Sequence, residues 1–151
     1  MKKIIFALSL VLLTISTAFA DWELDLKKLS TSLNIAVSDK DGEREVTSTL
    51  SLEFNKTQDW IIKTKGETGL TYGELSIALS IARQTNKDVN IVISDYKKHG
   101  HAWGRVAKAY GVRTDDLVQS VGKVNEKAKG KGKGKGAEKG KGHGKGKKWE
   151  D

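Results

Sequence analysis

The most distinctive chemical feature of the sequence is a set of lysines placed on glycines near its C-terminal end. Between residues 129 and 148, glycine occupies every second position over most of the stretch. Lysine binds as a hydrated point charge, and glycine gives the chain no fixed conformation that would hold those charges in register. This pattern is typical of non-specific association with anionic polymers or surfaces, which is driven by counterion release and surface potential. The lysines predicted to take part are Lys129, Lys131, Lys133, Lys135, Lys139, Lys141, Lys145, Lys147 and Lys148.

The positive charge of the chain is confined to this end. Residues 21–122 carry 14 basic and 15 acidic side chains, a net charge of −1, whereas residues 123–151 carry 11 lysines and 4 acids, a net charge of +7. The second segment has too few apolar side chains to offset the entropy lost on ordering. We therefore predict a folded domain over residues 21–122 and a disordered tail over residues 123–151. An alternative is that the tail only keeps the domain in solution.

The residue types needed for catalysis or metal binding are sparse. His99 and His101, with Asp95 one helical turn earlier, are the best candidates for a metal site, but their number and spacing are poor for one. An exposed Asp95–His99 pair near a helix end explains the same residues. The chain has no cysteine, and it contains no nucleophile elbow, zinc-protease motif or phosphate-binding glycine loop. We predict no catalytic residues, no cofactor and no metal.

The N-terminal twenty residues have the pattern of a secretory signal peptide. Lys2 and Lys3 precede an apolar run of about a dozen residues, which ends at Ala18-Phe19-Ala20. That run is too short for a membrane-spanning helix, which needs about 20 apolar residues. We expect cleavage before Asp21, export to the periplasm or the extracellular space, and no transmembrane anchor in the mature chain.

The second half of the domain shows helical periodicity. Apolar residues recur at helical spacing in residues 70–86, 87–100, 101–112 and 113–124. Thr71 and Glu74 have the spacing of a capping box, and Asp115 and Asp116 follow a helix start at Thr114. A further short helix is predicted within residues 21–33.

Residues 33–54 fit two structures. Leu33, Ile35 and Val37 alternate, as do residues 50, 52 and 54, and a D-K-D-G turn lies between these two sets, which favours a hairpin. Val46, Leu50 and Phe54 also have the spacing of one helical face. We favour the helix, because a lone hairpin beside four helices is poorly stabilised.

Residues 96–117 resemble a motif of uncharacterised exported bacterial proteins that are small and helical. The motif is a helix, a glycine-rich turn and then W-G-x-[IV]-A-[KR]-x-x-G-[VI], and this chain departs from many of those proteins at Ala102, where they have glycine. The resemblance implies a helical secreted domain with a Gly/Lys-rich tail, and it implies no activity. The matching residues are Trp103, Gly104, Val106, Ala107, Lys108, Gly111 and Val112, of which Trp103, Gly104, Ala107 and Gly111 are taken as the structural motif.

Ala107, Gly111 and Leu117 also have the spacing of a helix-turn-helix, which reflects close helix packing around a corner. Asp115 and Asp116 would lie near phosphates at the start of a recognition helix, and the signal peptide directs the chain out of the cytoplasm, so sequence-specific DNA binding is disfavoured. Gly111 is predicted to occupy a left-handed turn position between two helices.

These observations predict a mainly α-helical domain of about five helices, with an N-terminal hairpin as the alternative over residues 33–54. The expected protein is an exported, non-enzymatic envelope or extracellular module. Its polycationic tail would bind lipopolysaccharide, acidic polysaccharide or nucleic acid without specificity. The alternative is a ligand- or protein-binding helical domain with a solubilising tail.

Overall fold

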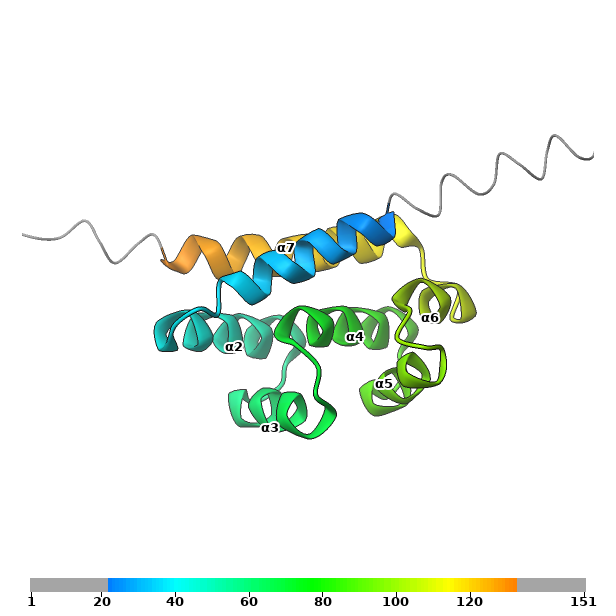
Figure 1. Cartoon of the computed structure of the whole chain (residues 1–151), viewed down its shortest axis with the longest axis horizontal. Coiled ribbons are helices and arrows are strands. Elements are labelled where there is room, and N and C mark those ends of the chain that lie inside the picture. Colours follow the sequence, from blue (N-terminus) through cyan, green and yellow to red (C-terminus); the bar gives the residue numbers. More distant parts are fainter. Residues whose placement is uncertain (1–21, 133–151) are drawn as a thin grey trace, which may run out of the picture.

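The computed structural model describes residues 22–132, and within that range the chain folds as seven helices without a strand (Figure 1). The mainly α-helical class is confirmed, whereas the predicted number of about five helices was too low. The helices span 22–35 (the N-terminal helix), α2 Lys40–Phe54, α3 Gln58–Thr68, α4 Tyr72–Thr85, α5 Val89–Lys98, α6 Trp103–Ala109 and α7 Thr114–Gly132.

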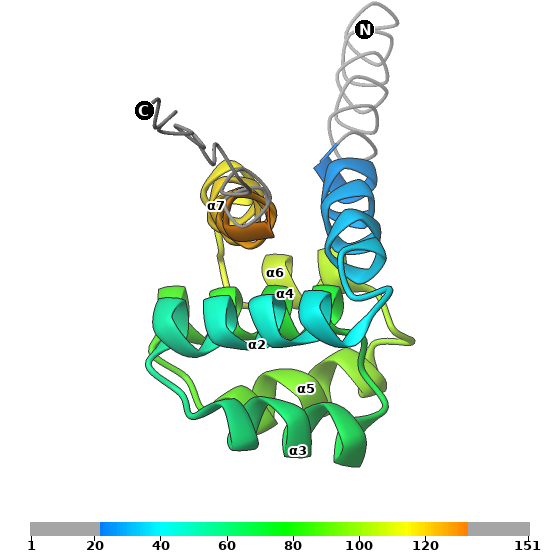
Figure 2. The ribbon, with the colours of Figure 1, turned by 90° about the vertical axis from the view of Figure 1, so that its left-hand side faces the viewer.

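The helices are arranged in layers. In the two perpendicular ribbon views, the N-terminal helix and α7 lie on one side of α2 and α4, while α3 and α5 lie on the other side (Figures 1 and 2). α7 packs along both α2 and α4, α2 pairs with α3, and α4 pairs with α5. α4 is therefore the central helix, and it is buried along most of its length.

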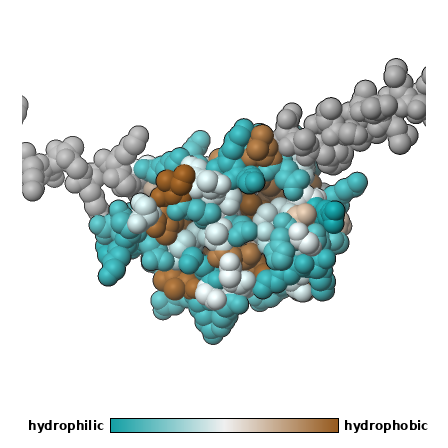
Figure 3. Space-filling view, in the orientation of Figure 1, coloured by the Kyte–Doolittle hydropathy of each residue, from teal (hydrophilic) through white to brown (hydrophobic). Residues whose placement is uncertain are grey.

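One apolar core joins these layers. Each of the seven described helices contributes a side chain with no exposed area: Leu33, Leu50, Ile61, Leu75, Val92, Val106 and Leu117. Each such residue contributes about 1.5–3 kcal/mol relative to an exposed side chain. On the face shown in Figure 3, apolar residues lie in separate patches within a hydrophilic surface.

Residues 40–54 form a helix, which excludes the hairpin alternative. Asp39 is the N-cap of α2 and accepts a hydrogen bond from the Gly42 amide at 2.6 Å, so the D-K-D-G sequence starts a helix. Leu50 is fully buried while Leu52 is 73 % exposed. Two residues of the same alternating set thus have opposite environments, and burial follows the helical period.

Sequence periodicity did not reveal α3. The Thr57 side chain accepts a hydrogen bond from the Trp60 amide at 3.1 Å, and Gly69 ends the helix with a φ of 73°. Only Ile61 and Thr64 are buried on this helix. Its apolar stripe is too short to stand out, although the cap and the terminal glycine are present in the sequence.

The domain extends beyond the predicted boundary at Gly122. α7 continues to Gly132, and Val124 and Ala128 are 0 % and 5 % exposed. The boundary was placed too early because the lysine-rich composition begins before the helix ends. Residues 123–132 therefore belong to the folded domain. The predictions of a signal peptide at residues 1–20 and of disorder after Gly132 lie outside the described residues.

The helices repeat at an interval of 31 residues. Gly42, Gly73 and Gly104 occupy the first turns of α2, α4 and α6, and their spacing is constant (73 − 42 = 31 and 104 − 73 = 31). Asn55 and Asn86 end α2 and α4 at the same interval (86 − 55 = 31). The pairs α2–α3 and α4–α5 are thus two copies of one helix-pair unit, and such units bury a continuous core when they stack.

The repeated glycines allow the N-terminal helix and the turn after it to approach closely. A Cβ atom at Gly73 would lie 2.4 Å from the Ser30 carbonyl oxygen, and one at Gly42 would lie 1.9 Å from the Ala36 carbonyl oxygen. The Gly73 amide also donates to the Asn34 side chain at 2.9 Å. The first turns of α2 and α4 are therefore in direct contact with this segment.

Candidate functional site

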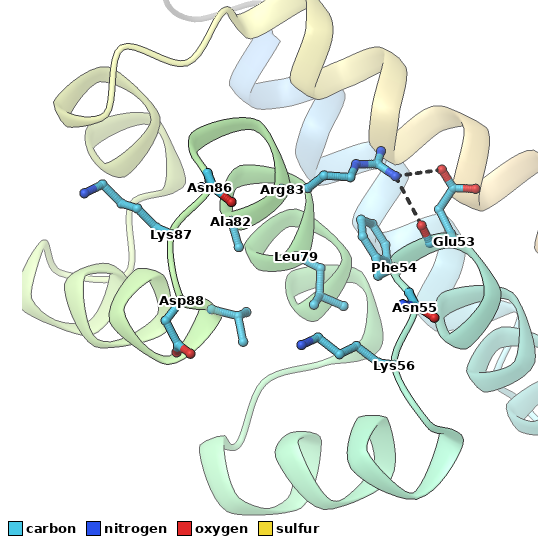
Figure 4. Close-up of a pocket in the computed structure, with 11 residues that line it drawn as sticks. Glu53, Phe54, Asn55, Lys56, Leu79, Ala82, Arg83, Asn86, Lys87 and Asp88 are labelled. Carbon is cyan, nitrogen blue, oxygen red and sulfur yellow. Dashed lines mark hydrogen bonds and ion pairs between the residues drawn. The ribbon is translucent and has the colours of Figure 1, made fainter.

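The candidate site is a hollow of about 540 Å³ between the ends of α2 and α4 (Figure 4). Leu79, Ala82 and Val89 form its buried apolar floor, and the half-buried Phe54 lines it from α2. Charged side chains surround this floor: Glu53, Lys56, Arg83, Lys87 and Asp88. A hollow of this size, with an apolar floor and a few polar groups, has the properties of a small-molecule site.

Two copies of the same turn frame the hollow. Asn55 ends α2 and Asn86 ends α4, each in the left-handed conformation with a φ of 51°. Asparagine tolerates this conformation better than most residues. The next residues, Lys56 and Lys87, donate their amides back to the last turn of the preceding helix at 3.1 and 3.0 Å. The 31-residue repeat thus places one lysine at each turn.

Glu53 is the centre of an ion-pair network above the hollow. Its carboxylate accepts from Arg83 at 3.0 Å and from Lys127 at 2.5 Å (Figure 4 shows the Arg83 contact). Arg83 also donates to Ser120 at 2.7 Å, and Ser120 donates to Ser80 at 3.1 Å. These bonds connect α2, α4 and α7.

This network changes the acidity of Glu53. The hydrogen bond from Lys127, followed by the one from Arg83, holds the pKa of the Glu53 carboxyl below its ordinary value of 4.5. Both bonds favour the charged form, and together they outweigh the opposing effect of burial. Glu53 is therefore a carboxylate at neutral pH, and its charge is already balanced within the protein.

The two turn lysines have aromatic neighbours. The Lys56 ammonium lies 5.1 Å from the centre of the Trp60 ring, and the Lys87 ammonium lies 5.1 Å from that of Tyr110. In Figure 4, Lys56 extends along the hollow, whereas Lys87 points away from the other labelled side chains. Cation–π contacts at exposed positions contribute only about 0.5–1 kcal/mol, so either lysine can be redirected at low cost.

The residues of the structural motif lie at α6 and its two ends. Trp103 is 7 % exposed and stacks on Tyr96 at 3.8 Å between ring centres, and Ala107 is fully buried. Gly111 has a φ of 65°, which places it in the left-handed region as predicted. Gly104 stands at the third copy of the repeated glycine position. In the structure these residues form packing contacts and a turn.

The histidine candidates for a metal site lie apart from any ligand cluster. Asp95 accepts a hydrogen bond from the Tyr110 hydroxyl and forms an ion pair with Lys98 at 3.3 Å. The Tyr110 bond, followed by the Lys98 bond, lowers the pKa of Asp95. The His101 ring meets the Tyr96 ring edge-on at 5.1 Å. Within residues 22–132 no group of three or more His, Cys, Asp or Glu side chains could hold a metal ion.

The predicted polyanion-binding lysines fall mostly beyond the described residues. Lys129 is exposed on α7, and Lys131 belongs to the last turn of that helix. The others lie outside the described residues: Lys133, Lys135, Lys139, Lys141, Lys145, Lys147 and Lys148. The charged residues around the hollow were not singled out by motif or periodicity. The repeated Asn-Lys dipeptide was the signal that could have revealed two of them.

Comparison of the chain with protein-family models, with curated proteins and with solved structures finds no match. Among the described helices, none is both long enough and apolar enough to span a bilayer.

Proposed function

We propose that the protein is an exported, non-enzymatic module whose lysine-rich C-terminal segment binds anionic polymers or surfaces. The observation that carries this proposal is the charge distribution, with +7 on residues 123–151 against −1 on residues 21–122. Lysines that alternate with glycine supply many point charges without a fixed geometry, which suits binding without sequence or shape selection.

The way α7 is attached supports this role. Val121, Val124 and Ala128 are buried on one face of α7, and Lys127 pairs with Glu53 of α2. Lys123 and Lys129 are exposed on the same helix. The helix that leads into the lysine-rich segment is therefore anchored to the domain, so an anionic polymer held by the lysines would be held to the whole protein.

The proposal also places the protein outside the cytoplasm, in the periplasm or the extracellular space. The first twenty residues carry the signal-peptide pattern, and Asp21 is the expected first residue of the exported form. Mass spectrometry of the exported protein should find Asp21 at its N-terminus. Recovery of the chain with Met1 intact would contradict this location.

The binding test compares tail variants of the full chain against lipopolysaccharide and a single-stranded DNA oligonucleotide. Replacing the seven lysines between residues 133 and 148 with glutamine should strongly weaken binding to both, because it removes seven of the nine predicted binding charges. Replacement with arginine should preserve binding, and scrambling the residue order should change little. Full-strength binding by the glutamine variant would overturn the proposal.

A second function is favoured by one observation, the hollow between the two Asn-Lys turns. A domain that binds a small ligand there, with a tail that only solubilises it, would lose no ligand binding in the glutamine variant. The same set of tail variants therefore separates the two functions.

A further inference from the structure

The hollow between α2 and α4 combines an apolar floor with positive charge at its rim. Leu79, Ala82 and Val89 are at most 8 % exposed and line the hollow. The volume of about 540 Å³ falls within the range of small-molecule sites. A small molecule with apolar surface fits this space.

The acids at the rim already have partners. Glu53 is bound by Arg83 and Lys127, and the Asp88 side chain accepts a hydrogen bond from the Asn90 amide at 2.7 Å as the N-cap of α5. The rim lysines differ, because aromatic rings rather than carboxylates lie next to Lys56 and Lys87 among the described residues. The rim thus offers cations that can take an external anion.

We propose that this hollow binds a small organic anion with an apolar body. The acidic group would lie against the Lys56 ammonium, with the Arg83 side chain, which is 44 % exposed, adding positive charge nearby. The apolar body would cover Leu79, Ala82 and Val89. The Lys87 side chain, in the turn after α4, would leave the Tyr110 ring and contact the acidic group of the ligand.

The 31-residue repeat accounts for the position of this hollow. Each unit places an asparagine in the left-handed conformation and a lysine after it, and stacking brings the two turns to either side of one hollow. A charge-assisted hydrogen bond is roughly twice as strong as a neutral one. Lys56, which extends along the hollow (Figure 4), and Lys87, once it leaves the Tyr110 ring, would therefore select an acidic group on an apolar body over a neutral analogue.

The test uses two dyes that differ only in their charged group, anilinonaphthalene sulfonate and the uncharged phenylnaphthylamine. The full chain should bind the sulfonate, with fluorescence that rises and saturates at one site. The double variant Lys56→Gln/Lys87→Gln should bind it roughly tenfold more weakly, with little change in affinity for the uncharged dye. If the double variant bound both dyes more weakly by the same factor, the lysines would not distinguish the charged dye from the uncharged one. That result would overturn the proposal.

Two matched controls locate the binding. Lys97→Gln removes an exposed lysine near the other end of α5, so it should leave sulfonate binding unchanged. The tail variant with seven glutamines should also bind as the wild type does. If the tail variant loses the sulfonate and the double variant keeps it, the anion is bound by the tail and the hollow is not the site.

A second measurement does not depend on the dyes. Decanoate added to the labelled full chain should shift the methyl signals of Leu79, Ala82 and Val89, whereas decanol at the same concentration should shift them less. Shifts confined to other methyl groups would contradict a site in this hollow. Ligand binding in the hollow and polyanion binding by the tail can be tested separately. The tail variant leaves the hollow unchanged, and the double variant leaves the tail unchanged, so either proposal can fail while the other holds.

Discussion

Gly73 and Gly104 occupy the same position of the repeat but face different neighbours. A Cβ at Gly73 would lie 2.4 Å from a backbone oxygen of Ser30, whereas one at Gly104 would lie 3.2 Å from the carboxylate of Glu23, an exposed side chain that can move. The first contact can be relieved only by displacing the N-terminal helix. The second can be relieved by rotation of the Glu23 side chain.

Gly73→Ala should therefore destabilise the domain by roughly 1–3 kcal/mol, the usual cost of overpacking. Gly104→Ala is the matched control, and it should be neutral or stabilising by up to about 1 kcal/mol, because alanine favours the helix. Chemical denaturation of both variants measures the free energy of unfolding. Equal destabilisation by the two substitutions would contradict the close approach at Gly73.

Glu53 makes stability depend on pH in a defined direction. Its pKa is lower in the folded state than the ordinary value of 4.5, so its contribution is fully present above that pH. The contribution is lost as the pH falls through the folded-state pKa. Because Arg83 and Lys127 are 44 % and 58 % exposed, the network contributes only about 1 kcal/mol.

Glu53→Gln should lower stability by roughly 1 kcal/mol near pH 7, and the difference from wild type should shrink below about pH 4. Glu67→Gln is the control, since its pair with Lys63 is exposed and long at 3.7 Å, and it should change stability little. Thermal melts across the acid range measure both. A constant difference between Glu53→Gln and wild type at every pH would contradict the network.

At the scale of the helices, α7 extends the folded domain to at least Gly132. A chain that stops after Gly122 loses Val124, Ala128 and the Lys127–Glu53 pair, whereas a chain that stops after Gly132 keeps them. The first truncation should cost roughly 3 kcal/mol, and the second should cost little.

Melting temperatures of the two truncated chains measure this difference. The chain that ends at Gly122 should melt roughly 12–24 °C below the one that ends at Gly132. Identical melting would show that residues 123–132 add nothing to the fold, and would restore the boundary expected from composition.

The sequence predicted helices best where their signals were strong. The Thr71–Glu74 capping box is present at the start of α4, with the Thr71 amide bonded to the Glu74 carboxylate at 2.9 Å. α3 was missed because it buries only two residues, Ile61 and Thr64. The start of α2 was ambiguous because Asp39 and Gly42 occur in turns and in helix caps alike.

Local sequence patterns could not predict the candidate site. Lys56 and Arg83 are 27 positions apart (83 − 56 = 27), and only the stacking of two helix pairs brings them to one hollow. Glu53 meets Lys127 across a separation of 74 residues. The 31-residue repeat was nevertheless readable from the glycine and Asn-Lys spacings, and it would have predicted α3 as the counterpart of α5.

At the scale of the whole molecule, the chain combines a nearly neutral helical domain with a strongly basic end. The two parts have separate chemistry, because the hollow at α2 and α4 is small and partly apolar while the lysine-rich segment carries only point charges. Residues 123–132 belong to both, since they are rich in lysine and also complete the core. Any truncation meant to test the tail must therefore begin after Gly132.

The most direct test of the central claim is the salt dependence of binding to a single-stranded DNA oligonucleotide, measured for the full chain and for the chain that ends at Gly132. If about six lysines engage phosphates, the logarithm of the full chain's binding constant should fall against the logarithm of salt concentration with a slope of roughly −4, from about 0.7 per phosphate. The shortened chain keeps only Lys129 and Lys131 of the predicted binding lysines, so it should bind far more weakly and with a much shallower slope. Equal affinity and equal slope for the two chains would contradict the account, and would place the polyanion site on the helices.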